Sequence, residues 1–349
     1  MMKKGEFISK QEATLLSGVA VALMVFHHLF GFPERISSSY VMLFDNQYIH
    51  METILSYFGR ICVSIFAFSS GYGLTKKALS NINSRSNVRN LYSNALRQLK
   101  KFYIKYWIVF IIFIPIGFLI GRYDIKICEL IKSFFGLSSI YNGEWWYVSY
   151  YVKFLLIFPL LFLFNDYVAS KKHGDKLLGL LLLVFIIFIM VSYNGLSVFL
   201  SFYEGMIFVN LGIYEKLYAK IKKSVIIGGC CTCFVFALSM WIRMIKVGDS
   251  QYDYIFAPIL IFCMVLWFKS RFFIKYVKDI LLVVGKYSTY IWLTHTFFAY
   301  YYFQPLIYVM EYSTIIYIWC MVISIVTGII CDKINYRLEK CVFSKIGKH

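Results

Sequence analysis

A short set of ionisable side chains lies inside long apolar runs of this sequence, and these side chains are the first candidates for chemistry. They are His27, His28, Arg60, Lys153, Glu204, Lys286 and His295. An ionisable group in hydrocarbon is costly, so each one indicates a function unless it reaches the membrane surface or a partner. Histidine exchanges a proton near neutral pH, which makes the histidines candidates for general acid–base catalysis.

The same residues also have structural explanations. A histidine near a helix end often makes a packing hydrogen bond, and this alternative applies to His27 and His295. Arg60 and the two lysines are long enough to extend their charges toward the head groups. Glu204 lies in the middle of its run, so we expect it to pair with a basic side chain of another helix.

The elements that must position these groups are transmembrane helices. Of 349 residues, 60% are hydrophobic and 15% are charged, whereas soluble domains carry roughly 25% charged residues. Apolar segments of about 20 residues, the length that crosses a bilayer, recur along the chain. The predicted spans are Ala13–Gly31, Ile54–Leu74, Phe102–Gly121, Trp145–Asn165, Leu177–Ser192, Leu196–Ile213, Val225–Ile242, Tyr254–Phe268, Ile280–Phe303 and Ser313–Cys331. We therefore expect an all-α fold, a polytopic membrane helix bundle of about ten transmembrane helices forming a single integral-membrane domain over residues 1–349.

The distribution of lysine and arginine predicts the orientation of these helices. With the N-terminus inside, the inside segments hold 27 basic residues and the outside segments hold six. This bias follows the positive-inside rule and predicts that both termini are cytoplasmic. Most of the net charge of +18 is thereby explained by topology, and no nucleic-acid partner is expected.

Helix rise predicts that several of the polar groups share one level of the membrane. At about 1.5 Å per residue, His28 and His295 each lie about 22 Å along helices that run outward, and Arg60 lies about 9 Å below the outer end of its helix. Glu144 and Trp145 mark the outer end of the fourth span. These groups are therefore expected to meet in the outer half of the membrane.

One cytoplasmic segment is more basic than topology requires. Between Lys76 and Lys105 there are eight basic residues and no acidic one. Such a cluster binds either anionic lipid head groups or a phosphorylated cytoplasmic ligand. The cysteines inside apolar runs fit neither a zinc site nor a disulfide framework, so we expect no metal.

Four stretches in order resemble the acyltransferase 3 family of membrane O-acyltransferases. They are "LLSGVAVALMVFHHLFG", "GRICVSIFAFSSGYGLTKK", "EWWYVSYYVKFLLIFPLL" and "YSTYIWLTHTFF". The resemblance implies transfer of an acyl group, usually acetyl from cytoplasmic acetyl-CoA, to a hydroxyl of a glycan such as a capsule, O-antigen or exopolysaccharide unit. It places His28 at the family's first-helix histidine. Ser17 stands where the family has a basic residue, which implies either that another group such as Lys10, Lys76 or Lys77 replaces that residue or that activity is reduced or lost.

The candidate site residues follow from the depth estimate, the basic segment and the resemblance together. The catalytic candidates are His28, His295 and Arg60. The substrate-binding candidates are Glu144, Trp145, Trp146, Tyr147, Tyr290 and Glu204, where the aromatic rings suit the apolar faces of sugars. The cofactor-binding candidates, which would hold acetyl-CoA, are Lys76, Lys77, Arg97, Lys101 and Lys286.

Two mechanisms remain open for His28. As a general base it takes the proton of the acceptor hydroxyl, or it forms a transient acyl-histidine that relays the group across the membrane. His295, Arg60 or the Nε1 of Trp145 would then donate a hydrogen bond to the oxyanion or the sugar.

Two other classes of protein compete with the enzyme. A transporter or flippase of a lipid-linked saccharide is expected to show inverted repeats and helices broken by glycine or proline, but this chain has five prolines and no visible repeat. A membrane sensor or scaffold gives no reason to bury His28, Arg60 and Glu204. The Lys-, Ile-, Asn- and Tyr-rich composition suggests the inner or sole cell membrane of a low-GC bacterium, where membrane lipids surround the protein.

Overall fold

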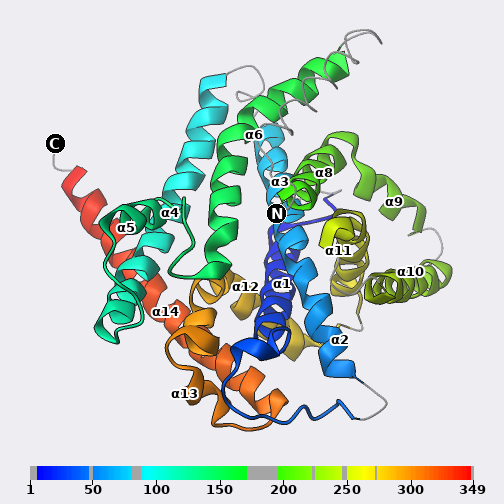
Figure 1. Cartoon of the computed structure of the whole chain (residues 1–349). Helices are drawn as coiled ribbons and strands as arrows, with labels where there is room; N and C mark the ends of the chain where they lie inside the picture. The colour runs from blue at the N-terminus through cyan, green and yellow to red at the C-terminus, as the bar shows by residue number, and fades with distance from the viewer. Residues whose placement is uncertain are drawn as a thin grey trace. The chain divides into compact units, whose positions relative to one another are not determined.

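The fold is helical throughout the part of the chain that the structure describes (Figure 1). The structure is a computed structural model, which describes residues 6–46, 50–80, 88–170, 195–221, 225–245, 250–271 and 273–346. Within these residues, β-type pairing is limited to two isolated bridges. The predicted all-α class is confirmed. The predicted span Leu177–Ser192 lies outside the described residues.

The chain forms two compact units. The first contains residues 1–20, 61–98 and 150–280, and the second contains residues 21–60, 99–149 and 281–349. Four helices contribute residues to both units, and they are α1 (Lys10–Phe30), α4 (Val88–Leu119), α6 (Trp146–Ser170) and α12 (Lys275–Thr296).

The remaining elements belong mainly to one unit each. In the first unit they are α3 (Cys62–Ser80), α8 (Leu196–Leu211), α9 (Ile213–Ile221), α10 (Val225–Ile245), η6 (Ser250–Tyr252) and α11 (Asp253–Lys269). In the second unit they are η1 (Pro33–Arg35), α2 (Met51–Phe58), η2 (Gly59–Ile61), α5 (Ile127–Phe134), η4 (Gly143–Trp145), the π-helical turn η7 (Phe297–Tyr301), α13 (Gln304–Tyr308) and α14 (Ser313–Ile346).

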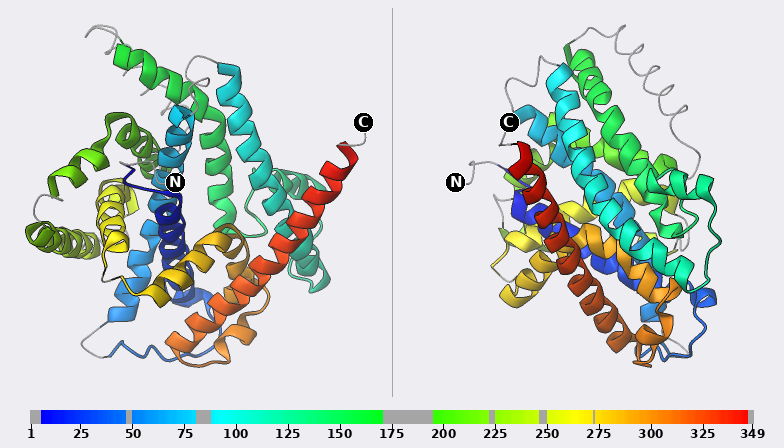
Figure 2. Two further views of the ribbon diagram at one scale, coloured as in Figure 1. Left: turned by 180° about the vertical axis from the view of Figure 1, so that it is seen from behind. Right: turned by 90° about the vertical axis from the view of Figure 1, so that its left-hand side faces the viewer.

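Two glycines let α3 and α8 touch along their backbones in the first unit. A Cβ at Gly71 would lie 1.9 Å from the carbonyl oxygen of Phe202, and a Cβ at Gly205 would lie 2.2 Å from that of Phe68. Small residues at membrane helix interfaces permit this close approach. Helix α8 then ends at Gly212, whose φ of 60° is left-handed, and the chain bends by 64° into α9 (Figure 2).

The segment before α1 is fixed by a capping box and by aromatic packing. The Ser9 N–H donates to Glu12 Oε2 at 2.8 Å, and the Glu12 N–H lies 3.4 Å from Ser9 Oγ. This reciprocal pair satisfies the free N–H groups at the helix start. Phe7 is buried, with ring centroids 4.9 Å from Phe262 and 5.2 Å from Tyr214. The N-terminal segment is therefore part of the first unit's core.

The loop after α1 is hydrogen-bonded to the start of α14 in the second unit. The Val41 N–H donates to Glu311 at 2.8 Å, and the Ser313 N–H donates back to Val41 at 2.9 Å. Buried Glu52 accepts hydrogen bonds from the Ser313 hydroxyl and the Phe44 N–H. These bonds hold the course of the loop that carries η1.

Five of the described helical stretches are long and apolar enough to cross a membrane. They are Lys10–Phe30, Met51–Ser80, Val88–Leu119, Gly143–Val168 and Ser313–Lys340, and the bent pair of α8 and α9 would make a sixth. Helices α10, α11 and α12 coincide with the predicted seventh, eighth and ninth spans to within several residues. The polytopic membrane bundle is confirmed, and the number ten stays a prediction.

Candidate active site

His28 lies at the centre of a buried polar cluster in the second unit. Its Nδ1 is 2.7 Å from Nε2 of His295, and its Nε2 is 3.2 Å from Oε2 of Glu144. These residues come from the last turn of α1, the last turn of α12 and η4. The structure thus brings together three of the residues that helix rise placed at one level.

Hydrogen bonding determines the proton positions in this cluster. Nδ1 of His295 lies 2.8 Å from the carbonyl oxygen of Ile291 and 3.0 Å from that of Trp292. Carbonyl oxygens only accept, so Nδ1 of His295 carries a proton. In neutral His295 the Nε2 is then an acceptor, and Nδ1 of His28 must donate to it.

This arrangement leaves Nε2 of His28 as the reactive ring nitrogen. Without a proton, it would direct a lone pair at the Glu144 carboxylate, which also offers only lone pairs. The 3.2 Å contact therefore represents the imidazolium, whose Nε2–H donates to the carboxylate, and loss of that proton leaves the Nε2 lone pair able to accept a proton from a substrate. A group that exchanges one proton in a buried site is suited to acid–base chemistry.

Arg35 holds the other oxygen of Glu144. Its Nη1 lies 2.8 Å from Oε1 of the carboxylate. The guanidinium is 4.1 Å from the ring centroid of Phe32 and 5.5 Å from that of Tyr300. Burial lowers the pKa of Arg35, but the hydrogen bond and charge of Glu144 outweigh burial and raise it, so the guanidinium stays charged.

The loops around Glu144 are fixed by side-chain amides. The Asn142 Oδ1 accepts from the Glu144 N–H at 3.1 Å, and its Nδ2 donates to Oγ1 of Thr296 at 2.8 Å. Gln304 Nε2 donates to the carbonyl oxygen of Arg35 at 2.9 Å, and its Oε1 accepts from the Ser37 N–H at 2.9 Å. The backbone that carries Glu144 and the backbone that carries Arg35 are therefore both held by side-chain hydrogen bonds.

Aromatic rings line the region beside this pair. Phe32 stacks on His28 with centroids 6.1 Å apart, and Tyr300 meets the same imidazole edge-on at 6.5 Å. The Tyr301 hydroxyl accepts from the Gly143 N–H at 2.9 Å. Arg122 lies 5.4 Å from the ring centroid of Tyr301.

His27 has a packing role. Its Nδ1 lies 2.8 Å from the carbonyl oxygen of Ser56, which joins α1 to α2. A Cβ at Gly59 would lie 2.9 Å from Cβ of His27, so the two helices are closely packed at this point. Arg60, a predicted catalytic residue, is near enough to His27 to interact electrostatically.

The predicted aromatic site residues differ in exposure. The Trp145 indole is buried and donates from Nε1 to the carbonyl oxygen of Leu293 at 3.1 Å, so this donor is already used by the fold. Tyr147 is also buried and packs on Trp292, with centroids 5.5 Å apart. Trp146 is 36% exposed. Tyr290 is buried beneath Lys105, whose Nζ is 5.4 Å from the ring centroid.

The predicted lysines occupy different environments. Lys76 donates to the carbonyl oxygen of Ile8 and lies 3.5 Å from the Glu6 carboxylate, so it anchors the N-terminal segment. The other predicted cofactor-binding residues are exposed, and they are Lys77, Arg97, Lys101 and Lys286.

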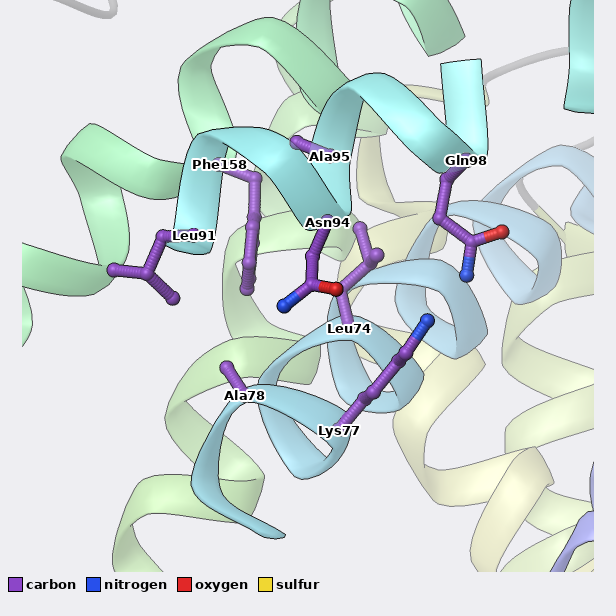
Figure 3. Close-up of a pocket in the computed structure, with 8 residues that line it drawn as sticks. All are labelled: Leu74, Lys77, Ala78, Leu91, Asn94, Ala95, Gln98 and Phe158. Carbon is purple, nitrogen blue, oxygen red and sulfur yellow. The ribbon is translucent and has the colours of Figure 1, made fainter. Parts of the chain in front are cut away.

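Lys77 lines a pocket in the first unit (Figure 3). Asn94 and Gln98 of α4 supply amides, and Figure 3 shows the Gln98 amide on the same side of the pocket as the Lys77 amino group. The apolar residues of the pocket are Leu74, Ala78, Leu91, Ala95 and Phe158. The pocket is small, but its one cation and two amides can donate hydrogen bonds to an anionic group at its mouth.

Glu204 lies on α8 in the first unit. Its Oε2 is buried and has no hydrogen-bond partner among the described residues. The basic partner expected from the sequence is not found within that part of the chain. Ser17, at the position where the related family has a basic residue, donates its hydroxyl to the carbonyl oxygen of Ala13 at 3.0 Å.

Several residues of the cluster were not predicted from the sequence, chiefly Arg35, Phe32, Asn142 and Tyr300. The available signal for Arg35 was its place seven residues after His28, just beyond the end of the helix.

Among the described residues, no group of three or more His, Cys, Asp or Glu side chains is arranged to hold a metal ion.

Comparison with known proteins assigns the family. No curated protein and no solved structure matches the chain significantly. The model of the acyltransferase 3 family, described as an acyltransferase domain, matches residues 13–331. The matched region contains both histidines of the buried pair and the carboxylate beside them. The chain therefore belongs to the acyltransferase 3 family of membrane acyltransferases.

Proposed function

We propose that this membrane acyltransferase moves an acetyl group from acetyl-CoA to a hydroxyl of a cell-surface or lipid-linked glycan, with His28 as general base. The observation that carries the proposal is the fixed tautomer of His28. Its Nδ1 is committed to His295 at 2.7 Å, which leaves Nε2 to react beside Glu144. We place the protein in the cell membrane of a bacterium, with both termini in the cytoplasm.

The reaction at this centre is a proton-assisted acyl transfer. With His28 neutral at the start, the acceptor oxygen attacks the thioester carbonyl carbon and forms a carbon–oxygen bond, while the hydroxyl proton passes to Nε2 of His28. The tetrahedral intermediate then collapses, the carbon–sulfur bond breaks, and the thiolate takes the proton back from the imidazolium. The products are the ester and the free thiol of CoA.

The neighbours of His28 support this role. Glu144 is held by Arg35 and stabilises the imidazolium that forms when His28 takes the proton. His295 fixes the ring orientation and tautomer, because its own Nδ1 is bonded to two backbone carbonyls. His295 is thus a positioning residue in this scheme. An acyl-histidine intermediate would use the same Nε2, since Nδ1 faces His295.

Donor binding is assigned to the basic residues of α3 and α4. Lys77, Asn94 and Gln98 line a small pocket and offer a cation and two amides to a phosphate group at its mouth. Arg97 and Lys101 are exposed on α4 and stand four residues apart, on one face of the helix. The pantetheine arm separates the phosphates of CoA from its thioester, so phosphate binding and acyl transfer use different residues.

Acceptor binding is assigned to the aromatic residues near Glu144. Trp146 is partly exposed, and Phe32 and Tyr301 lie beside Arg35 and Gly143. Sugars stack their apolar faces on aromatic rings and hydrogen-bond to charged groups, and such rings with an arginine provide both contacts.

The test is acetyl transfer by the purified protein in phospholipid nanodiscs. Acetyl-CoA and lipid-linked saccharides extracted from the membranes of the native host are supplied, and CoA thiol release is measured together with the mass of the saccharides. We expect thiol release that depends on the protein and one added acetyl group. Movement of unmodified saccharide across a vesicle membrane without acetyl-CoA would instead favour a flippase.

A further inference from the structure

The chain leaves α12 through a π-helical turn beside the catalytic candidates. The turn η7 spans Phe297–Tyr301 and begins two residues after His295. It closes with the Tyr302 N–H donating to the carbonyl oxygen of Phe297 at 2.8 Å, a bond between residues i and i+5. π-Helical turns are rare and recur at functional sites, because the widened turn redirects the side chains that follow.

The π-turn places Tyr300 next to the His28 imidazole and to Arg35, which binds the carboxylate at Nε2 of His28. The two rings meet edge-on with centroids 6.5 Å apart. The Arg35 guanidinium lies 5.5 Å from the Tyr300 ring centroid, and Tyr300 interacts electrostatically with both Arg35 and Glu144. His295, in contrast, occupies the Nδ1 side of His28. Tyr300 therefore borders the region in which the thioester and the acceptor would react.

The hydroxyl of Tyr300 is buried beside the Arg35 guanidinium, which is only able to donate to it, and no described group accepts the proton of the hydroxyl. Buried hydroxyls in folded proteins nearly always have a hydrogen-bond partner, so an unused one at a reactive centre requires an explanation. The Tyr302 hydroxyl is also without a partner among the described residues, but its ring packs on Phe297 and Tyr123 and not on His28. Two other tyrosines of the region use their hydroxyls. Tyr301 accepts from the Gly143 N–H, and Tyr308 donates to the carbonyl oxygen of Leu29 at 2.8 Å.

We propose that the Tyr300 hydroxyl donates a hydrogen bond to the carbonyl oxygen of the thioester as that oxygen becomes an oxyanion. The inference rests on the proposed acyl transfer and adds to it the residue that stabilises the tetrahedral intermediate. The carbonyl oxygen gains negative charge as the acceptor–carbon bond forms, and it loses that charge when the carbon–sulfur bond breaks. Tyr300 keeps its proton throughout. A donor that is already positioned in a buried site stabilises this charge without reorganisation.

The test is the Tyr300→Phe variant, which removes one oxygen atom and keeps the ring. We expect kcat to fall by about 10²-fold to 10³-fold, the usual effect of removing one oxyanion donor. The KM for acetyl-CoA should remain near that of the parent protein, because the bond forms in the transition state. The unfolding temperature in detergent should change little, because the lost hydroxyl donates to no described group and Arg35 keeps its hydrogen bond to Glu144.

Tyr141→Phe is the matched control. The Tyr141 hydroxyl is also buried without a described hydrogen-bond partner, but its ring packs against Phe118 and Tyr123 rather than His28. We expect Tyr141→Phe to keep the parent rate. If the parent protein transfers acetyl groups and Tyr300→Phe does so at the same rate, the role of Tyr300 is overturned and the proposed function is not. Absence of acetyl transfer by the parent protein would overturn the proposed function together with it.

Discussion

The two adjacent histidines of α1 show how surroundings, rather than residue type, determine reactivity. His27 donates to the carbonyl oxygen of Ser56 and packs between two helices. His28 is held by His295 at one nitrogen and faces Glu144 with the other. Successive side chains on a helix point about 100° apart. His27 and His28 therefore face different neighbours, and only His28 faces a carboxylate.

Glu144→Gln tests the electrostatic part of the centre. The amide keeps the shape of the carboxylate but cannot stabilise the imidazolium, so we expect kcat to fall by about 10²-fold. The KM for acetyl-CoA should stay unchanged, as measured by initial rates of CoA thiol release. Glu129→Gln is the control, because Glu129 pairs with Lys132 at 2.8 Å on exposed α5. Full activity in Glu144→Gln would remove the carboxylate from the mechanism.

At the scale of elements, close backbone contact joins α3 to α8. A Cβ at Gly71 would meet the backbone of Phe202, whereas a Cβ at Gly73 would meet nothing within 4 Å. The two glycines thus have opposite roles on one helix. Gly71 is required for packing, while Gly73 adds only backbone freedom.

Gly71→Ala should destabilise the protein and Gly73→Ala should not. Forcing the two helices apart costs about 1–3 kcal/mol, whereas alanine at an open helical position is about 1 kcal/mol more favourable than glycine. Thermal unfolding of both variants in the same detergent measures the difference. Equal unfolding temperatures would show that the helices do not meet at Gly71.

Lys76 and Lys77 are neighbours in sequence, but their substitution is predicted to affect different properties: stability for Lys76 and donor binding for Lys77. Lys76 is bonded to the N-terminal segment through Ile8 and Glu6, so Lys76→Ala should lower the unfolding temperature. Lys77 lines the pocket with Asn94 and Gln98. Lys77→Ala should therefore raise the KM for acetyl-CoA by about threefold to tenfold, because one exposed charged hydrogen bond to the donor is lost. An unchanged KM in Lys77→Ala would remove the pocket from donor binding.

The helices could be predicted because hydropathy alone marks a segment that lipid surrounds. The predicted spans coincide with described helices, apart from Leu177–Ser192, which is outside the described residues and is not tested. Helix rise also brought His28, His295 and Glu144 to one level, because depth along a straight helix depends only on residue number. The contribution of Arg35 was missed, since the path of a loop depends on contacts distant in sequence, such as those of Gln304.

The π-turn and the use of the Trp145 indole were also beyond prediction. A π-helical turn has no reliable sequence signature, so the position of Tyr300 depends on the tertiary structure. Trp145 suited a sugar-binding role by residue type, but its Nε1 donates to the carbonyl oxygen of Leu293. Residue type identifies what a side chain is able to do, and only its neighbours show which groups are already engaged.

At the scale of the whole molecule, the family assignment identifies a membrane acyltransferase, and the charge distribution predicts from which side each proposed substrate would arrive. The match covers residues 13–331. The basic segment from Lys76 to Lys105 is predicted to face the cytoplasm, where acetyl-CoA is made. The loop between Gly121 and Glu144 is predicted to face outside, where a surface glycan is found.

Cysteine labelling tests this orientation. Cys128 is exposed on α5, in a loop predicted to lie outside. A membrane-impermeant maleimide should label it in cells whose outer barriers are open but whose cell membrane is intact, and Cys128→Ser should abolish that signal. Labelling of Cys128 only after the cell membrane is permeabilised would reverse the predicted topology.

The central claim is that Nε2 of His28 accepts the proton of the acceptor hydroxyl, and the comparison of His28→Asn with His27→Asn tests it most directly. Asparagine keeps an N–H near the position of Nδ1. His28→Asn therefore retains a donor to His295 but has no Nε2. His27→Asn, the control, retains the donor to the carbonyl oxygen of Ser56. In nanodiscs with acetyl-CoA and extracted lipid-linked saccharides, acetyl transfer should fall by about 10²-fold to 10⁴-fold in His28→Asn and remain near the parent rate in His27→Asn. Transfer by His28→Asn at the parent rate would contradict the account.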